Sequence, residues 1–318
     1  MAKKRKKPAS AIRPSNKLDP TGVDALERRA MKDFARRINK VKTVYQNALN
    51  RVPASPAVNA RYEFQLNPSI LSQILNDASY LVDQILLDGG EHDLWFYEYV
   101  DQAATRGTAQ SFTNLSQQSA AYAAERESLA AILISEPYQR RMALVNAREF
   151  EEMKGLTAQI KADMSRVLTD GIGRGLNPRE VSRNLTAQAG IEKGRANRIA
   201  RTEITTALRR ARWDEADEAT SILGLNVRLL HFSALSPTTR MAHALRHGHL
   251  YTVDEVREWY ATGANAINCK CSQVEVLVDE KGEALNSNVI EMARKEFKET
   301  WGKRMAVNHH CCGHKHAA

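Results

Sequence analysis

The chain has 318 residues, 43% of them hydrophobic, and 46 Lys and Arg against 37 Asp and Glu give it a net charge of +9. This length can bury a sizeable core in one large domain or two ordinary ones, and the hydrophobic share excludes a wholly disordered chain. Seven basic residues and no acidic residue precede Asp19. Most of the excess charge is therefore N-terminal, which argues against a uniformly basic DNA-binding domain.

The N-terminal segment 1–20 combines this basic cluster with three prolines and few apolar side chains. Such a composition buries too little apolar surface to offset the entropy of ordering, so we predict a disordered basic arm. We expect its cationic side chains to contact nucleic acid or an acidic surface in a salt-sensitive way. These side chains are Lys3, Lys4, Arg5, Lys6 and Lys7.

Residues 21–169 are predicted to be mainly helical and to form a docking region. Apolar residues recur every three or four positions from Val23 to Leu49, which is typical of an amphipathic helix. Alternation over 58–66 predicts one strand, and helical periodicity then continues through 91–135 and 138–169. The acidic stretch 61–136 would be repelled by DNA, so we expect it to face protein.

Residues 170–282 mix helices and strands and are predicted to form a compact module. Asn177-Pro178 is typical of a helix start, with helices predicted over 178–188 and 194–220. Apolar runs at 227–235 and 274–278 predict two strands, with a short helix near 253–260 between them. A terminal helix and a His/Cys-rich tail occupy 283–318. The predicted fold is α+β, in which a long helical N-terminal region precedes an α+β module with a small sheet.

The helix over 195–212 carries six arginines and Glu203 as its only acid. Two interpretations remain open, namely a groove for phosphate or an acidic partner and a solvated, internally paired face. Arg201 and Glu203 stand two apart and cannot face each other on a helix. We therefore expect them to bind separate partners as part of a structural brace.

A set of histidines and cysteines is the strongest chemical signal. The candidate zinc ligands are a subset of His243, His247, His249, Cys269 and Cys271. The first three are His243 and the two cysteines, and either His247 or His249 would be the fourth. The alternative is that the cysteines are buried packing residues and the histidines surface polar groups. A metal-dependent nuclease or hydrolase is the competing function, but no general base stands out in the sequence.

Four cysteines in two tight pairs favour a reducing compartment, and no apolar run reaches the roughly 20 residues that span a bilayer. The N-terminus lacks the apolar segment of a secretory signal. We therefore expect a soluble chain made in a cytoplasm.

The order of the motifs resembles the phage Mu F-like minor head proteins, also called head morphogenesis proteins, over about 170–280. Ala200-Arg201-Thr202-Glu203 is similar to that family's A-R-T-E helix, and Arg240-Met241-Ala242-His243 to its R-x-x-H segment. Asn268-Cys269-Lys270-Cys271 is similar to its closing N-C-R-C. The resemblance leads us to expect an internal brace of Arg201, Glu203, Arg240 and His243.

The resemblance also implies a function, that of a non-enzymatic protein of a tailed-phage virion that is assembled in the host cytoplasm. The implied partners are the portal protein, the major capsid or scaffold proteins and packaged double-stranded DNA, reached through the basic arm. No membrane contact is implied in the assembled head. The implied role is procapsid assembly and DNA packaging or ejection.

Overall fold

A computed structural model describes residues 8–58 and 61–302, which divide into two compact units. The described part of the first unit comprises 8–25, 100–140 and 202–302, and the second unit comprises 26–99 and 141–201. The unit boundaries fall inside helices, whereas the predicted domains 21–169 and 170–282 are continuous in sequence. The difference arises because the long helices α1, α3, α6 and α7 each contribute residues to both units.

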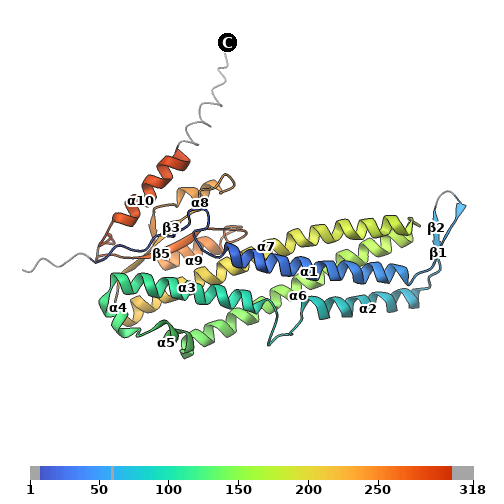
Figure 1. The fold of residues 1–318 in the computed structure, drawn as a ribbon, viewed down its shortest axis with the longest axis horizontal. Coiled ribbons are helices and arrows are strands. Elements are labelled where there is room, and N and C mark those ends of the chain that lie inside the picture. Colours follow the sequence, from blue (N-terminus) through green and yellow to red (C-terminus); the bar gives the residue numbers. More distant parts are fainter. Residues whose placement is uncertain (1–7, 59–60, 303–318) are drawn as a thin grey trace, which may run out of the picture. The chain divides into compact units, whose positions relative to one another are not determined.

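The second unit is a helical bundle with a small hairpin (Figure 1). It is built from most of α1 (Asp24–Asn50), β1 (Ala54–Pro56), β2 (Tyr62–Phe64), α2 (Pro68–Leu86), most of α6 (Glu136–Gly173) and the first half of α7 (Pro178–Leu223). The predicted strand over 58–66 thus shortens to β2, which pairs antiparallel with β1. In α2, the Asn67 side chain accepts the Ile70 N–H and caps the helix at Pro68.

The apolar stripe of α1 forms the core of this bundle. Phe34, Ile38 and Tyr45 are buried at helical spacing, and Phe34 packs edge-on against Trp95 with ring centroids 4.8 Å apart. The Tyr45 hydroxyl donates to the Lys161 carbonyl at 3.1 Å, which links α1 to α6. The helical periodicity read from the sequence thus corresponds to the buried face.

Helix α7 is longer than the sequence pattern predicts, since one helix replaces the two expected over 178–188 and 194–220. Gly190 and Gly194 lie inside it, and an added Cβ at either position would meet no neighbouring atom. Buried Ala189 and Ala196 on either side hold the segment helical despite the low propensity of glycine. The predicted start is confirmed, because the Asn177 side chain accepts the Arg179 N–H at 2.9 Å just before Pro178.

The expected helix over 91–135 is divided into three. They are α3 (Tyr97–Gln118), α4 (Ala120–Glu125) and α5 (Leu129–Ile134). Ser119 and Ser128 each accept an N–H of the following turn and start new helices, so local caps override the apolar periodicity. Pro137 lies in the first turn of α6, where its missing N–H costs no hydrogen bond.

The first unit contains a three-stranded antiparallel sheet in the order β4-β3-β5. Its strands are β3 (Val227–Phe232), β4 (Leu250–Tyr251) and β5 (Ser272–Leu277), and its shorter helices are α8 (Met241–Leu245), α9 (Val253–Ala261), α10 (Asn288–Phe297) and the π-helix η2 (Lys298–Gly302) (Figure 1). The predicted α+β fold with a helical N-terminal region and a small sheet is confirmed.

Both faces of this sheet are covered. Val227 and Leu229 of β3 pack with Trp213 of α7 and Val256 of α9 on one face. The other face packs against α10 and the segment that precedes α1, through Leu230, Phe232, Val274, Val276, Val289, Ile290, Ala293 and Ala11. Because both faces are buried, all six residues of β5 are buried, including Gln273 and Glu275.

The segment from residue 8 to 23 is not a free arm. Ala11 is buried, the Ile12 N–H donates to Asn114 at 2.7 Å, and the Asn286 side chain donates to the Pro8 carbonyl at 3.1 Å. The prediction of a disordered arm over 1–20 therefore differs from the structure from Pro8 onward. A few buried apolar groups and backbone hydrogen bonds hold the segment despite its polar composition.

None of the helices within 8–58 and 61–302 combines the length and apolarity needed to cross a bilayer.

Candidate metal centre

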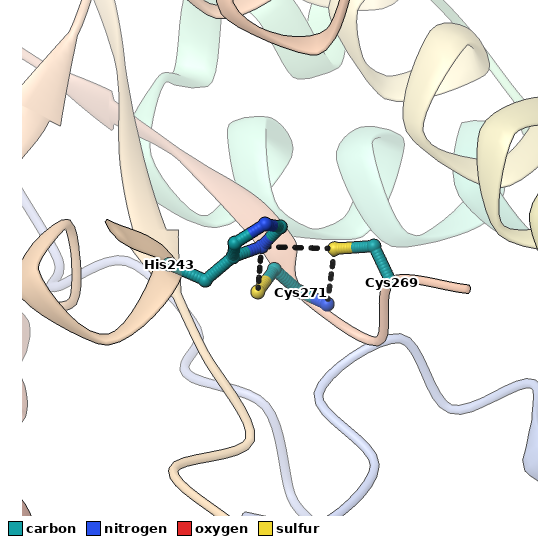
Figure 2. A group of neighbouring side chains, drawn as sticks. All are labelled: His243, Cys269 and Cys271. Atoms are coloured by element: carbon teal, nitrogen blue, oxygen red, sulfur yellow. Dashed lines mark hydrogen bonds between the residues drawn. The ribbon is translucent and has the colours of Figure 1, made fainter. Parts of the chain in front are cut away.

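Three of the proposed ligands lie together in the first unit. His243, Cys269 and Cys271 are buried, and their ligand atoms all fall within 4.8 Å of one another. Figure 2 shows the imidazole facing both thiols, with Nδ1 at 3.4 Å from Sγ of Cys269 and at 3.5 Å from Sγ of Cys271. The Cys271 N–H also points at Sγ of Cys269, at 3.4 Å. Two sulfurs and one nitrogen therefore converge on a common point.

Local backbone geometry presents the two cysteines to the histidine. Asn268 has a φ of +53°, a left-handed conformation that turns the chain just before Cys269. The Asn268 N–H donates to the Thr202 hydroxyl at 3.0 Å, which ties the turn to α7. From the same helix, the buried Arg209 guanidinium donates to the carbonyls of Cys269 and Cys271 at 3.3 and 3.4 Å. The cysteine turn is thus anchored at three backbone points.

His243 is oriented by the short helix α8 and by its aromatic neighbour. The ring packs edge-on against Trp259 with a centroid separation of 4.7 Å, which fixes the direction of Nδ1. Arg240, at the N-terminus of α8, donates to the carbonyls of Asn265 and Ile267 at 3.0 and 3.1 Å. Arg240 therefore ties α8 to the loop that leads into Cys269.

The electrostatic environment shifts the pKa values of the two thiols in opposite directions. The hydrogen bond from Cys271, followed by contributions from His243 and Arg209, lowers the pKa of the Cys269 thiol well below its usual range against the effect of burial. The same sulfur–sulfur contact, together with burial, raises the pKa of Cys271 well above it. Burial also raises the pKa of Tyr260, whose hydroxyl lies 3.8 Å from Sγ of Cys269. The centre therefore stabilises negative charge on Cys269 first.

The other histidines lie apart from this group. Nδ1 of His247 accepts the Ser233 N–H at 3.1 Å, and burial lowers the pKa of His247. His249 is exposed. Nδ1 of buried His231 lies 3.3 Å from Nε2 of Gln273. Of the five proposed ligands, the structure brings together His243 and the two cysteines and does not add His247 or His249.

The residues expected to form a brace contact different groups. Arg201 pairs with buried Glu27 within the second unit, with 2.7 Å between Nε and Oε2. Glu203 is half-buried on α7. Arg240 holds loop carbonyls, and His243 faces the cysteines. Arg201, Arg240 and His243 therefore contact different groups.

Several arginines of the 195–212 segment are used inside the protein. Arg195 pairs with Asp163 and Glu192, and buried Arg212 pairs with Glu275. These contacts favour the internally paired interpretation for these positions over an open phosphate groove. Lys3, Lys4, Arg5, Lys6 and Lys7 of the basic arm lie outside the described residues.

Sequence reasoning missed two sets of buried contacts in the first unit, the network around Glu275 of β5 and the anchors of the cysteine turn on α7. Glu275 accepts hydrogen bonds from Asn114 at 2.8 Å, from Ser111 at 2.5 Å and from Arg212 at 2.6 and 2.9 Å. Its signal in the sequence is a charged residue between the two valines Val274 and Val276. Thr202 and Arg209 had no comparable signal, because their partners are backbone groups more than 50 residues away.

Comparison with known proteins gives one match. No curated protein and no solved structure matches the chain significantly. A family model described as Phage Mu protein F like protein matches residues 162–274, about a third of the chain, from the middle of α6 into β5. The matched segment includes Thr202, Arg209, His243 and both cysteines of the centre. Residues 162–274 are thus similar to the Phage Mu protein F like family, the same family that the order of the sequence motifs resembles.

Proposed function

We propose that this protein is a minor head protein of a tailed bacteriophage, bound near the portal, that aids procapsid assembly and DNA packaging or ejection. The observation that carries the proposal is the family match over 162–274. The matched segment runs through α7, β3, α8, β4 and α9, and these elements position the cysteine turn and its anchors. The function assigned to the family is architectural, so the chain is proposed to act as a structural component and not as an enzyme.

The hydrolase alternative requires a general base beside the centre. A catalytic zinc keeps an open coordination position and needs a neighbouring general base to activate water. The ligand cluster found among the described residues consists of one histidine and two cysteines. The buried carboxylate of Glu275 is already bonded to Ser111, Asn114 and Arg212. Three protein ligands leave one zinc position open, so the support for a structural role is that this cluster of described residues contains no carboxylate to act as a general base.

The second unit offers a surface on which portal or capsid subunits could dock. Large apolar side chains are exposed on its helices, with Tyr80 at 64% on α2, Leu144 at 68% on α6 and Ile191 at 60% on α7. Exposed apolar side chains mark a protein-binding surface where they form one contiguous patch. We propose that this unit contacts the protein wall of the head through such side chains.

The decisive experiment is made in the phage that encodes the protein. A nonsense mutation in the gene would be combined with purification of procapsids and virions and with mass spectrometry of their components. We expect the protein in wild-type procapsids at low copy number together with the portal, and a loss of infectious particles in the mutant. Absence of the protein from procapsids and virions would overturn the proposal. Metal-dependent DNA cleavage by the purified protein would favour the hydrolase instead.

The proposed DNA contact through the basic arm has its own test. Lys3→Gln, Lys4→Gln and Lys6→Gln together should weaken duplex DNA binding and make its salt dependence shallower by about one power of salt concentration for each lost phosphate contact. The matched control removes three exposed charges of α1, as Arg28→Gln, Lys32→Gln and Lys40→Gln. Equal affinity in the arm variant and the wild type would place DNA binding elsewhere, with the 195–212 helix as the next segment to test.

A further inference from the structure

We propose that the first unit contains a structural zinc site whose protein ligands are Nδ1 of His243 and the Sγ atoms of Cys269 and Cys271. The proposed head function does not require a metal, so the two proposals can fail separately. The site is inferred from the convergence of three buried ligand atoms drawn from two segments about 25 residues apart.

The distances fit a tetrahedral zinc ion. With Zn–S of about 2.3 Å, Zn–N of about 2.0 Å and tetrahedral angles, a coordinated sulfur and nitrogen lie roughly 3.5 Å apart. The two sulfur–nitrogen distances in the structure are 3.4 and 3.5 Å. The two sulfur–nitrogen distances therefore already match those of a tetrahedral zinc site, and zinc would bind without a large movement of His243 relative to either cysteine.

Hydrogen bonding alone does not account for this arrangement. A neutral imidazole nitrogen has either one lone pair or one N–H, and each points in a single direction. Two sulfurs at nearly equal distance from Nδ1 of His243 cannot both lie on that direction. Ligands placed around a shared central ion produce this geometry directly. Binding would leave two thiolates and a neutral imidazole on Zn²⁺, and any proton that the three ligand atoms still hold would be released to solvent.

The surroundings match a structural site in two further respects. The Cys271 N–H directed at Sγ of Cys269 at 3.4 Å would stabilise a metal-bound thiolate. Arg209 holds both cysteine carbonyls, so the turn is fixed before any ion binds. Three protein ligands leave the fourth position of the tetrahedron for a water molecule or another ligand.

The ion would fasten two irregular segments to the sheet. His243 follows the turn region 236–240, while the cysteines follow the loop 262–268, and neither segment has regular strand or helix pairing. Cys269 and Cys271 also belong to the apolar cluster that contains Trp213, Val256 and Leu229. Zinc would therefore lock α8 and the cysteine turn onto the core of the first unit.

The test uses the full-length protein in a background that removes tail binding. The C-terminal His309, His310, Cys311, Cys312, His314 and His316, which lie outside the described residues, would be replaced by serine or asparagine, since such a tail can bind metal by itself. We expect one zinc ion per chain by elemental analysis of this tail variant after dialysis, and at least one in the wild type. Zinc that disappears with the tail would overturn the proposal.

Ligand substitutions then assign the site. His243→Asn, Cys269→Ser and Cys271→Ser, each in the tail variant, should reduce the zinc content to background. The matched controls His247→Asn and His249→Asn should retain it. Loss of zinc in the two controls and not in the three ligand variants would contradict the assignment.

Two measurements on protein with native ligands guard against variants that do not fold. X-ray absorption at the zinc edge should show two sulfur and two nitrogen or oxygen neighbours. Chelation of the metal should lower the melting temperature while phage DNA remains uncleaved in the presence of added zinc. A coordination shell without sulfur, or a melting temperature unchanged when zinc is removed, would overturn the structural site.

Discussion

The buried ion pair between Arg212 and Glu275 yields the most quantitative prediction. Both side chains are nearly inaccessible, at 5% and 0% exposure, and Nη2 lies 2.6 Å from Oε2. Glu275→Gln keeps the shape of the side chain but leaves the Arg212 charge buried without its counter-ion. The new amide NH2 group would also face the donors that bond to the carboxylate in the wild type. Breaking a buried pair on one side costs about 3–5 kcal/mol of the free energy of unfolding.

Urea unfolding followed by tryptophan fluorescence and circular dichroism measures this loss. With a denaturant dependence of about 3 kcal/mol per molar urea, the midpoint should fall by roughly 1–1.7 M. The matched control is Asp77→Asn, which breaks the pair between Arg51 and Asp77, whose side chains are 46% and 48% exposed. Solvent-exposed pairs contribute about 0–1 kcal/mol, so the control should shift little. A Glu275→Gln midpoint no lower than that of the control would refute the reasoning.

The same residue gives the chain a defined acid sensitivity. Burial raises the pKa of Glu275, but Arg212 and Ser111 outweigh burial and the net pKa is lowered. A carboxyl with a lowered folded pKa stabilises the protein above its unfolded pKa of about 4.3, and this contribution is lost as the pH falls through the folded value. The midpoint of the wild type should therefore fall more steeply below pH 5 than that of Glu275→Gln, and parallel curves would contradict this.

Two further substitutions test local features. Gly89→Ala should strongly destabilise the second unit, because Gly89 has a φ of +90° and the new Cβ would lie 1.7 Å from the Asp93 carbonyl oxygen. The control Gly90→Ala meets no atom and should cost only about 1–2 kcal/mol, the strain of a left-handed alanine. Similar urea midpoints for the two variants would argue against the clash. Thr252→Ala removes the capping box with Glu255 at the start of α9 and should cost about 1 kcal/mol, measured in the same assay against Thr262→Ala beyond its C-terminus.

The sequence alone determined the parts of this protein that depend on local chemistry. The stripe from Leu26 to Leu49 specified α1, and Asn177-Pro178 specified the start of α7, because periodicity and capping act within a few residues. The order of short motifs likewise pointed to the family that matches residues 162–274. The candidate metal ligands were drawn from the correct residue types for the same reason.

Only the tertiary structure decided which of those residues meet. The sequence placed His243 with the two cysteines and left His247 or His249 as the fourth ligand. The structure brings the first three together and adds neither of the other two, because Nδ1 of His247 accepts the Ser233 N–H and His249 is exposed. The anchors of the cysteine turn on Thr202 and Arg209 act on backbone groups, which carry no sequence signature. Pairing across long stretches of chain depends on packing, and for that reason the sequence named the candidates while the fold selected among them.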